Sequence, residues 1–499
     1  MLKNILANWS HIILSVLAVF FLYPFCVQVL GEEQYGVWLL ISSMTGYFAL
    51  LQLGVPMANV RFVSKYYAQG DMEKVNEVVS SNFVFFTAAG VVVLLCGIGI
   101  ASLIDVVFQV PVEFRKIAKL AAIIASLNVA LSFSFEVFEG LLHALQKFVY
   151  FNVVKNLLLI VRVALTFVVL KYDNGLLVLA GLLVGVTLLQ AMFFYGFIRL
   201  RHPEIRIRRR YFKLDVFKVV VSYSAFILLF QFAGKLSFNT SSLVIGGVIS
   251  VAAIVFFTIS NNFILYFTQM VTGISNALMP RVSQLDALDE SHSLQEVYLN
   301  YSRLTSFVVV PVCFGLFIFG GDFIALWMGE KYRVVSGSVL SILTLSSLFL
   351  LVQKGVAYPI LMGTSRLRFP TLLLAGTALL NLLLSVWWGR VFGLNGVAWG
   401  TTVPNLVNAA GLVWYTCRAL KVPFGRYLYR GVLIPIGSGI FFAVPAFLIS
   451  KLANISSYTI FCSAVALCSM IYSVFYFIFC LDKNGKRNIY KKFRFSMAN

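Results

Sequence analysis

The feature of the sequence that most constrains its fold is a succession of apolar runs of about twenty or more residues, separated by short polar links. A helix of about 20 apolar residues spans the hydrocarbon core of a bilayer. Hydrophobic residues are 60% of the 499-residue chain and charged residues 12%, which leaves too few polar residues to cover a soluble protein. Open sheet edges are not viable in lipid, and the runs are too long for barrel strands. The sequence therefore predicts an all-α polytopic membrane protein.

We predict about 14 transmembrane helices. The first is not a cleaved signal, because it is long, contains Pro24 and has no small-residue cleavage pattern after it. The seventh and eighth are the least regular, because a polar run from Ser237 to Ser242 interrupts them. The predicted spans lie near residues 10–30, 35–60, 79–104, 119–142, 149–170, 175–198, 217–243, 250–280, 304–326, 337–362, 370–389, 394–417, 431–450 and 457–481.

The formal net charge of +20 would suggest nucleic-acid binding in a soluble protein. Here the basic residues alternate between links: 28 of the 39 lie in every second link, counted from the N-terminus, and only 8 in the others. By the positive-inside rule, this asymmetry predicts that both termini are cytoplasmic. The excess charge is thus mainly a topology signal, and no nucleic-acid partner is expected.

All seven cysteines fall inside apolar runs, and no CxxC or His-rich spacing accompanies them. Buried free thiols are the expected state. We therefore predict neither a metal site nor a cofactor.

Two halves of the chain resemble each other at an offset of 219 to 221 residues. Glu77-Val78 falls opposite Glu296-Val297, and Asn174-Gly175 falls opposite Asn395-Gly396. Six spans in each repeat imply a pseudo-two-fold axis along the membrane normal, an arrangement typical of transporters that work by alternating access. The predicted domains are an N-terminal six-helix lobe at 1–210, a C-terminal six-helix lobe at 211–430, two additional helices at 431–482 and a basic cytoplasmic tail at 483–499.

Polar residues recur at helical spacing within three spans. Seven-residue steps place each set in the second and eighth spans on one face, and the two sets are offset by 217 residues. The seventh span has a similar stripe at four-residue steps. These stripes either line a hydrated substrate cavity or form hydrogen bonds between packed helices. The residues are Thr45, Gln52 and Asn59; Asn262, Gln269 and Asn276; and Gln231, Lys235 and Asn239.

Three basic residues lie within spans without an acidic residue at helical spacing: Arg162, Lys235 and Lys354. Charge at this depth needs a partner, a water-filled cavity or an anionic substrate. Snorkelling or a distant ion pair is the structural alternative.

The fourth span presents Ser132, Glu136, Glu139 and His143 on one face. A short turn brings the fifth span back antiparallel, so Glu139 and Lys155 are expected at similar depth, as a structural ion pair. Glu136 either extends toward Arg162 or titrates during transport.

Several motifs resemble one family of membrane proteins along nearly the whole chain. Leu30-Gly-Glu-Glu-Gln-Tyr-Gly-Val-Trp38 is similar to the link between the first two spans of polysaccharide-unit flippases. Gln52–Arg61 with Gly70-Asp71, Met279–Ser283 and Gly393–Ala398 resemble their second-, eighth- and twelfth-span signatures. The family is the Wzx-like branch of the multidrug/oligosaccharidyl-lipid/polysaccharide exporter superfamily.

The resemblance implies two six-helix lobes with spans one, two, seven and eight around a cavity. It also implies a flippase of the bacterial cytoplasmic (inner) membrane, which moves undecaprenyl-pyrophosphate-linked oligosaccharide from the cytoplasmic to the periplasmic leaflet for O-antigen, capsule or exopolysaccharide synthesis. Membrane lipids and polysaccharide polymerase or assembly proteins are the implied partners. An anionic pyrophosphate would explain the basic residues within spans.

Two other functions compete with this interpretation. A cation-coupled drug exporter of the same superfamily usually has a carboxylate in span one or seven, and spans one, two, seven and eight contain none. A membrane-embedded polysaccharide polymerase or ligase would need a sizeable outer loop with basic or His residues. The outer links are short and the chain has only four His, so no enzyme activity is expected.

Overall fold

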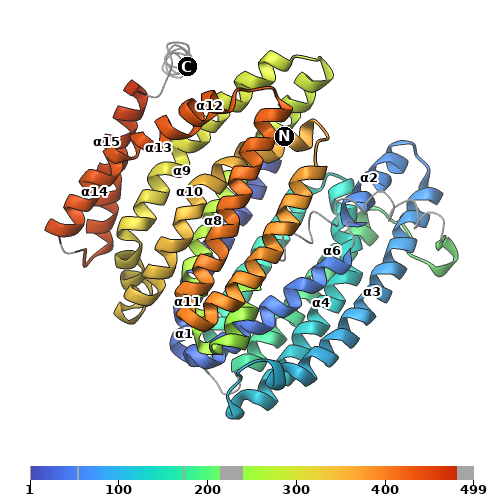
Figure 1. The fold of residues 1–499 in the computed structure, drawn as a ribbon. Helices are drawn as coiled ribbons and strands as arrows, with labels where there is room; N and C mark the ends of the chain where they lie inside the picture. Colours follow the sequence, from blue (N-terminus) through green and yellow to red (C-terminus); the bar gives the residue numbers. More distant parts are fainter. Residues whose placement is uncertain (1, 53–54, 172–174, 214–239, 454, 480–499) are drawn as a thin grey trace. The chain divides into compact units, whose positions relative to one another are not determined.

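The computed structural model describes residues 2–52, 55–171, 175–213, 240–453 and 455–479. The described chain is almost entirely helical and divides into two compact units, Met1–Val255 and Phe256–Asn499. The division falls in the first turn of one long helix, α8 (Val251–Ala287). Each unit is a bundle of long helices joined by short turns (Figure 1).

In the first unit, the helices are α1 (Leu2–Phe48), α2 (Val55–Ala68), α3 (Met72–Val107), α4 (Arg115–Ala144), α5 (Phe148–Val169) and α6 (Gly175–Arg201), with short 3-10 turns at Ala49–Gln52, Val112–Phe114 and Arg209–Tyr211. Helix α3 begins at Met72 because the Asp71 carboxylate accepts the backbone N–H of Lys74 at 3.0 Å. That hydrogen bond, together with the Lys74 ammonium, lowers the pKa of Asp71.

The second unit contains most of α8 and a second set of long helices. These are α9 (Ser291–Met328), α10 (Arg333–Gly363), α11 (Arg368–Ala419), α12 (Phe424–Tyr427), α13 (Ile434–Ser438), α14 (Ile440–Leu452) and α15 (Tyr458–Phe479), with a 3-10 turn at Glu330–Tyr332 and a π-helical segment at Leu428–Leu433. The last two predicted spans correspond to Phe424–Leu452 and Tyr458–Ile478.

Eleven helical segments in the described part are long and apolar enough to cross a membrane. Two of them contain two predicted spans each, because α1 is kinked at Gly31 and α11 at Gly393. Both glycines have positive φ, 74° and 61°, a backbone conformation that other residues rarely adopt. Apart from the second, the described spans agree with the prediction, whereas the predicted seventh span, 217–243, lies almost wholly outside the described residues.

The second glycine of each kinked motif permits a close backbone approach. A Cβ at Gly36 would overlap the carbonyl oxygen of Val251, and one at Gly396 would overlap that of Trp388. In both signatures, one glycine allows the kink and the other allows the close contact beside it. The resemblance motifs at 30–38 and 393–398 thus have a packing explanation.

The internal repeat is visible in the backbone of two turns. Gln146, between α4 and α5, and Ser365, between α10 and α11, both have φ of 57°. Three consecutive N–H groups around each turn donate to the same relative carbonyl oxygens, and the two sets are 219 residues apart. The turns centred on Gly70 and Asp289 share this hydrogen-bond pattern at the same offset. The two lobes therefore repeat in local geometry as well as in sequence.

The predicted second span is broken, contrary to the assumption that 35–60 forms one helix. Helix α1 ends at Phe48, a 3-10 turn covers Ala49–Gln52, and α2 starts at Val55. Pro56, the second residue of α2, fits this restart, because a proline in the first helical turn lacks only an N–H that would have no partner within the helix.

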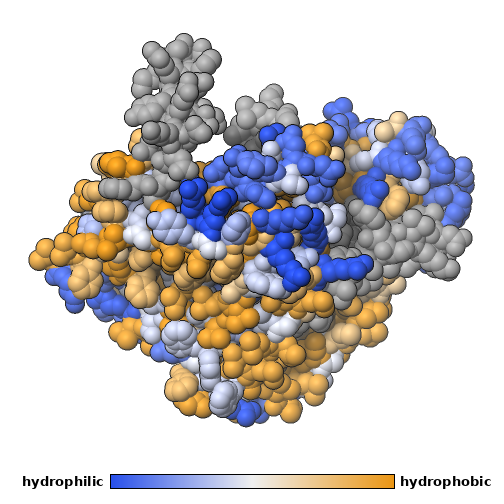
Figure 2. Space-filling model, turned by 45° about the horizontal axis from the view of Figure 1, so that its top comes forward, coloured by the Kyte–Doolittle hydropathy of each residue, from blue (hydrophilic) through white to orange (hydrophobic). Residues whose placement is uncertain are grey.

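Large apolar side chains cover the outer surfaces, as expected for contact with lipid. Along α3, Val84, Val91, Val92, Leu95 and Ile98 are exposed. Figure 2 shows broad hydrophobic areas on this face, with hydrophilic residues gathered in separate patches.

Candidate functional site

A polar junction ties three helices of the first unit together at Glu139 on α4. Oε2 of Glu139 lies 3.0 Å from Nζ of Lys155 on α5, and Oε1 accepts a 2.6 Å hydrogen bond from Nε2 of Gln190 on α6. The Lys155 ammonium also lies 4.5 Å from the centre of the Phe151 ring. Because both carboxylate oxygens are occupied, Glu139 has a structural role in this conformation.

The neighbouring residue on α5 extends the junction to α1. Oδ1 of Asn156 lies 2.8 Å from Nδ1 of His11, and Nδ2 of Asn156 donates to Oγ of Ser10 at 3.1 Å. Lys155 and Asn156 thus connect α5 to α4 and α1 through adjacent side chains. The result is a polar belt across α1, α4, α5 and α6.

Glu136 and Arg162 do not join the hydrogen bonds and ion pairs of this belt, although Glu136 is close enough to Glu139 and Lys155 to feel their charges. Both are half-buried, and neither side chain forms a hydrogen bond or ion pair with another described residue. The structure does not bring them together, although Arg162 lies on α5 two turns beyond Lys155. Contacts with other helices explain the burial of these two charged groups less well than that of Glu139 and Lys155.

In the second unit, the predicted stripe of α8 lies on the face that does not pack against α10. Oγ of Ser260 donates to the carbonyl oxygen of Ser336, and Ser275 donates to that of Lys354, which defines the packed face. Asn262 and Gln269 occur about half a turn around the helix from it. Gln269 is exposed within this unit and Asn262 is half-buried.

The matching stripe of the second span is interrupted. Thr45 belongs to α1, Gln52 to the 3-10 turn and Asn59 to α2, so these three positions do not share one continuous helical face. Thr45 is half-buried, and its hydroxyl donates to the carbonyl oxygens of Ile41 and Ser42 in its own helix. The three positions are thus divided over three helical elements, and the predicted equivalence of the two stripes stays a prediction.

Lys354 lies next to a close contact of α8, α9 and α10. A Cβ at the next residue, Gly355, would come within 2.9 Å of Thr305 Cγ2 and 3.0 Å of Val271 Cγ1. Lys354 itself is half-buried, and it interacts with other groups of the protein. It is therefore a weaker substrate-binding candidate than Arg162.

Three predicted residues lie outside the described residues: Gln231, Lys235 and Asn239. For Gln52, Asn59 and Asn276, the structure describes the backbone only. The assignment of all six residues to a substrate path stays a prediction.

Sequence reasoning missed several members of the polar belt. Gln190 is the only Gln of α6, and its neighbour Thr187 donates to Oδ1 of Asn128 on α4 at 2.8 Å. Isolated polar residues in apolar helices were the available signal, but the partner helix cannot be chosen from spacing alone. Within the described residues, no group of three or more His, Cys, Asp or Glu side chains is arranged to hold a metal ion.

Two curated relatives align along most of the chain. The membrane protein EpsK of Bacillus subtilis (strain 168) is 21% identical over 98% of this chain and 97% of its own length. A putative O-antigen transporter of Shigella flexneri is 19% identical over 80% of this chain and 93% of its own length.

Solved structures share the fold. The lipid II flippase MurJ, in an inward closed conformation, superposes with a TM-score of 0.74 at 15% identity and covers 95% of this chain and 99% of its own. An inward-facing multidrug resistance MATE family transporter superposes with a TM-score of 0.67 at 16% identity. The match covers 81% of this chain and 95% of the transporter. The family model of polysaccharide biosynthesis proteins matches residues 28–337, most of the chain. In agreement with the Wzx-like motifs, the chain belongs to this family of polysaccharide biosynthesis proteins.

Proposed function

We propose that the protein is a flippase that moves undecaprenyl-pyrophosphate-linked oligosaccharide repeat units from the cytoplasmic to the periplasmic leaflet. Its family acts in polysaccharide biosynthesis, one relative is described as a putative O-antigen transporter, and the MurJ fold belongs to a lipid II flippase. These names concern a lipid-linked or surface glycan, which favours a substrate of the same chemical class.

The observation that carries the proposal is the polar face of α8 that does not pack against α10. Amide side chains such as Asn262 and Gln269 pair with sugar hydroxyls through their donors and their acceptor. A lipid-facing helix surface would be apolar, as along α3. We infer that this face contacts the glycan during translocation, together with Asn276 and the polar positions of spans two and seven.

Arg162 is the proposed contact for the pyrophosphate. A guanidinium offers fixed donors that match phosphate oxygens, and a half-buried site strengthens such pairs. The side chain of Arg162 forms no hydrogen bond or ion pair with another described residue, so no existing ion pair must break before phosphate binds. Lys235 and Lys354 are further candidates for the same anion.

Alternating access is the proposed mechanism. The glycan headgroup cannot cross hydrocarbon unaided, whereas the polyprenyl chain can stay in lipid. Repeat-related lobes that rock between two states would open the polar path to one leaflet at a time. We place the protein in the bacterial cytoplasmic membrane with both termini in the cytoplasm, and we expect it to work beside polysaccharide polymerase and assembly proteins.

A cation-coupled drug exporter is the second candidate, favoured by the fold shared with the MATE transporters. Glu136 is the one half-buried carboxylate in the fourth span whose side chain has no hydrogen bond or ion pair among described residues. It would serve as the coupling group in that case. A membrane-embedded polymerase or ligase is the third candidate, but the relatives are named for transport rather than catalysis.

The experiment that separates these functions is deletion of the gene followed by analysis of lipid-linked intermediates. A flippase predicts that the complete repeat unit accumulates on its polyprenyl pyrophosphate while surface polysaccharide disappears. Loss of a polymerase would instead leave single repeat units at the cell surface. Normal polysaccharide with raised drug sensitivity would identify an exporter and contradict the proposal.

A further inference from the structure

The link after α6 is held against α3 as a fixed extended segment. Residues 202–213, here called the basic link, contain only a short 3-10 turn, and Arg208 has extended φ and ψ of −143° and 143°. Ile205, 4% exposed, is inserted into the apolar core of the first unit, and Ile207 packs partly against it. The link is therefore part of this unit's structure.

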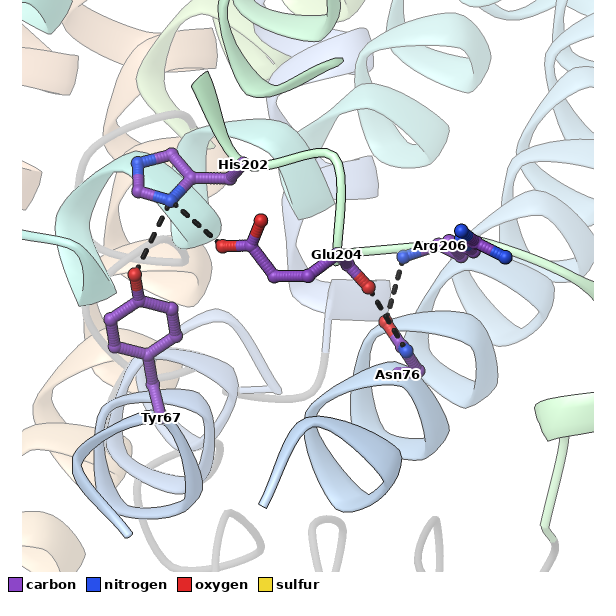
Figure 3. A network of polar contacts seen from close by, with 5 residues as sticks. All are labelled: Tyr67, Asn76, His202, Glu204 and Arg206. Atoms are coloured by element: carbon purple, nitrogen blue, oxygen red, sulfur yellow. Dashed lines mark hydrogen bonds and ion pairs between the residues drawn. The ribbon is translucent and has the colours of Figure 1, made fainter. Parts of the chain in front are cut away.

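Buried side chains of α3 replace the partner strand that an extended segment usually needs. Oδ1 of Asn76 accepts the N–H of Arg206 at 2.7 Å, and its Nδ2 donates to the carbonyl oxygen of Glu204 at 3.3 Å (Figure 3). One turn on, Oγ of Ser80 accepts the N–H of Arg208 at 3.2 Å. These contacts fix the backbone of the link at every second residue, at Glu204, Arg206 and Arg208.

Both ends of the link are also anchored. At the start, Nδ1 of His202 lies 3.3 Å from the hydroxyl of Tyr67 and 3.2 Å from Oε1 of Glu204 (Figure 3). At the end, Oγ of Ser81 accepts the N–H of Lys213 at 3.0 Å, and the Lys213 ammonium pairs with Glu77. That hydrogen bond to Glu77 raises the pKa of Lys213, so the anchor stays charged at neutral pH.

The clamped backbone presents four arginines within five residues. Arg206, Arg208, Arg209 and Arg210 are all exposed, and in Figure 3 the Arg206 side chain points away from the labelled cluster. Among the described residues, the only hydrogen bond or ring contact of these four guanidinium groups is that of Arg210 with Tyr211. Two acidic groups beside the link are already paired, since Glu77 binds Lys213 and Glu204 contacts His202.

The arginines lie at the depth where the lipid-facing surface of α3 begins. Val84 is the first exposed apolar side chain of that surface, four residues or about 6 Å along the helix from Ser80. Phosphate head groups border the hydrocarbon core of a bilayer, so lipid phosphates are the expected groups outside the protein at this depth. Clusters of four or more basic residues beside a membrane helix are typical of anionic lipid binding.

We propose that the basic link is a binding site for the head groups of anionic bilayer phospholipids, organised by Asn76, Ser80 and Ser81. A topology signal requires basic residues in this link but does not require them to be held in place. The fixed backbone spares the entropy that a flexible link would lose on binding. Guanidinium groups then bind phosphate oxygens in pairs.

The test measures retained lipid on the purified full-length protein by native mass spectrometry, in mixed phosphatidylglycerol and phosphatidylethanolamine. The R206Q/R208Q/R209Q/R210Q variant should retain phosphatidylglycerol at least about tenfold less than the wild type. The matched control R418Q/K421Q/R426Q/R430Q removes four exposed charges from another link and should retain it almost unchanged. Equal losses in both variants would overturn the site.

A second variant tests the clamp with all arginines in place. S80A/S81A removes hydroxyl contacts of the link, so phosphatidylglycerol retention should fall to an intermediate level. Wild-type retention would overturn the claim that α3 organises the site. Finally, an arginine variant that binds phosphatidylglycerol normally, yet transports less in liposomes without anionic lipid, would assign the link to the substrate and overturn the lipid proposal.

Discussion

Nζ of Lys155 lies 3.0 Å from Oε2 of Glu139, across the interface of α4 and α5. The side chains are only 25% and 19% exposed, so the pair is screened less than a surface pair. The same carboxylate binds Gln190, which makes it the point where three helices meet. The ion pair stabilises the lobe. Because the two charges are paired with each other, neither is available to bind a substrate.

A double-mutant cycle tests this structural role. E139Q and K155M should each lower stability by about 1.5–3 kcal/mol, because each leaves a partly buried group without its charged partner. The double variant should be less destabilised than the sum, with a coupling of about 1 kcal/mol or more. Thermal unfolding midpoints measured in detergent rank the variants by stability. Additive effects would mean that the two groups do not interact.

Arg162 is expected to affect transport rather than folding. R162A should reduce surface polysaccharide at least about tenfold, the effect of losing one charge-assisted phosphate contact. Protein level should stay normal, and R162K should restore part of the activity. K171Q, an exposed basic position just after α5, is the control and should have no effect. Full activity of R162A would contradict the proposal that Arg162 contacts the transported substrate.

The α8 face gives a prediction about water access. In a Cys-free background, N262C and Q269C should react with a hydrophilic thiol reagent, because polar side chains in a translocation path are hydrated. S260C and L278C, on the packed and buried face, should be protected. Single Cys residues at 45, 52 and 59 test the broken stripe of the second span in the same way. Protection at 262 and 269 would favour helix packing over a hydrated path.

The kink in α11 gives a prediction about stability. G396A should lower stability by about 1–3 kcal/mol or more, because the new methyl group would overlap the backbone at Trp388. In the same helix, a Cβ at Gly376 meets no heavy atom within 4 Å. G376A should therefore be neutral or slightly stabilising. Fluorescence-detected size-exclusion chromatography after heating compares the two, and equal midpoints would contradict the packing explanation of Gly396.

The sequence predicted the helices well because lipid imposes a simple rule of length and apolarity on each span. The repeat was also readable, since the turns at Gln146 and Ser365 carry it in both sequence and backbone. The break before Pro56 was missed because apolarity continues through 49–54, although the proline itself was a signal. The basic link was missed as well. Its partners Asn76, Ser80 and Ser81 formed a visible polar run, but which link they bind depends on tertiary packing.

The central claim is that the protein moves a lipid-linked glycan across the bilayer, and reconstitution measures this directly. Purified protein in liposomes would receive a polyprenyl-pyrophosphate-linked oligosaccharide, whose transfer between leaflets is followed with a membrane-impermeant glycan-modifying enzyme. The account predicts faster transfer with the wild type than with R162A or empty liposomes. It also predicts no uptake of a cationic dye driven by an ion gradient. Dye transport without glycan transfer would contradict the account.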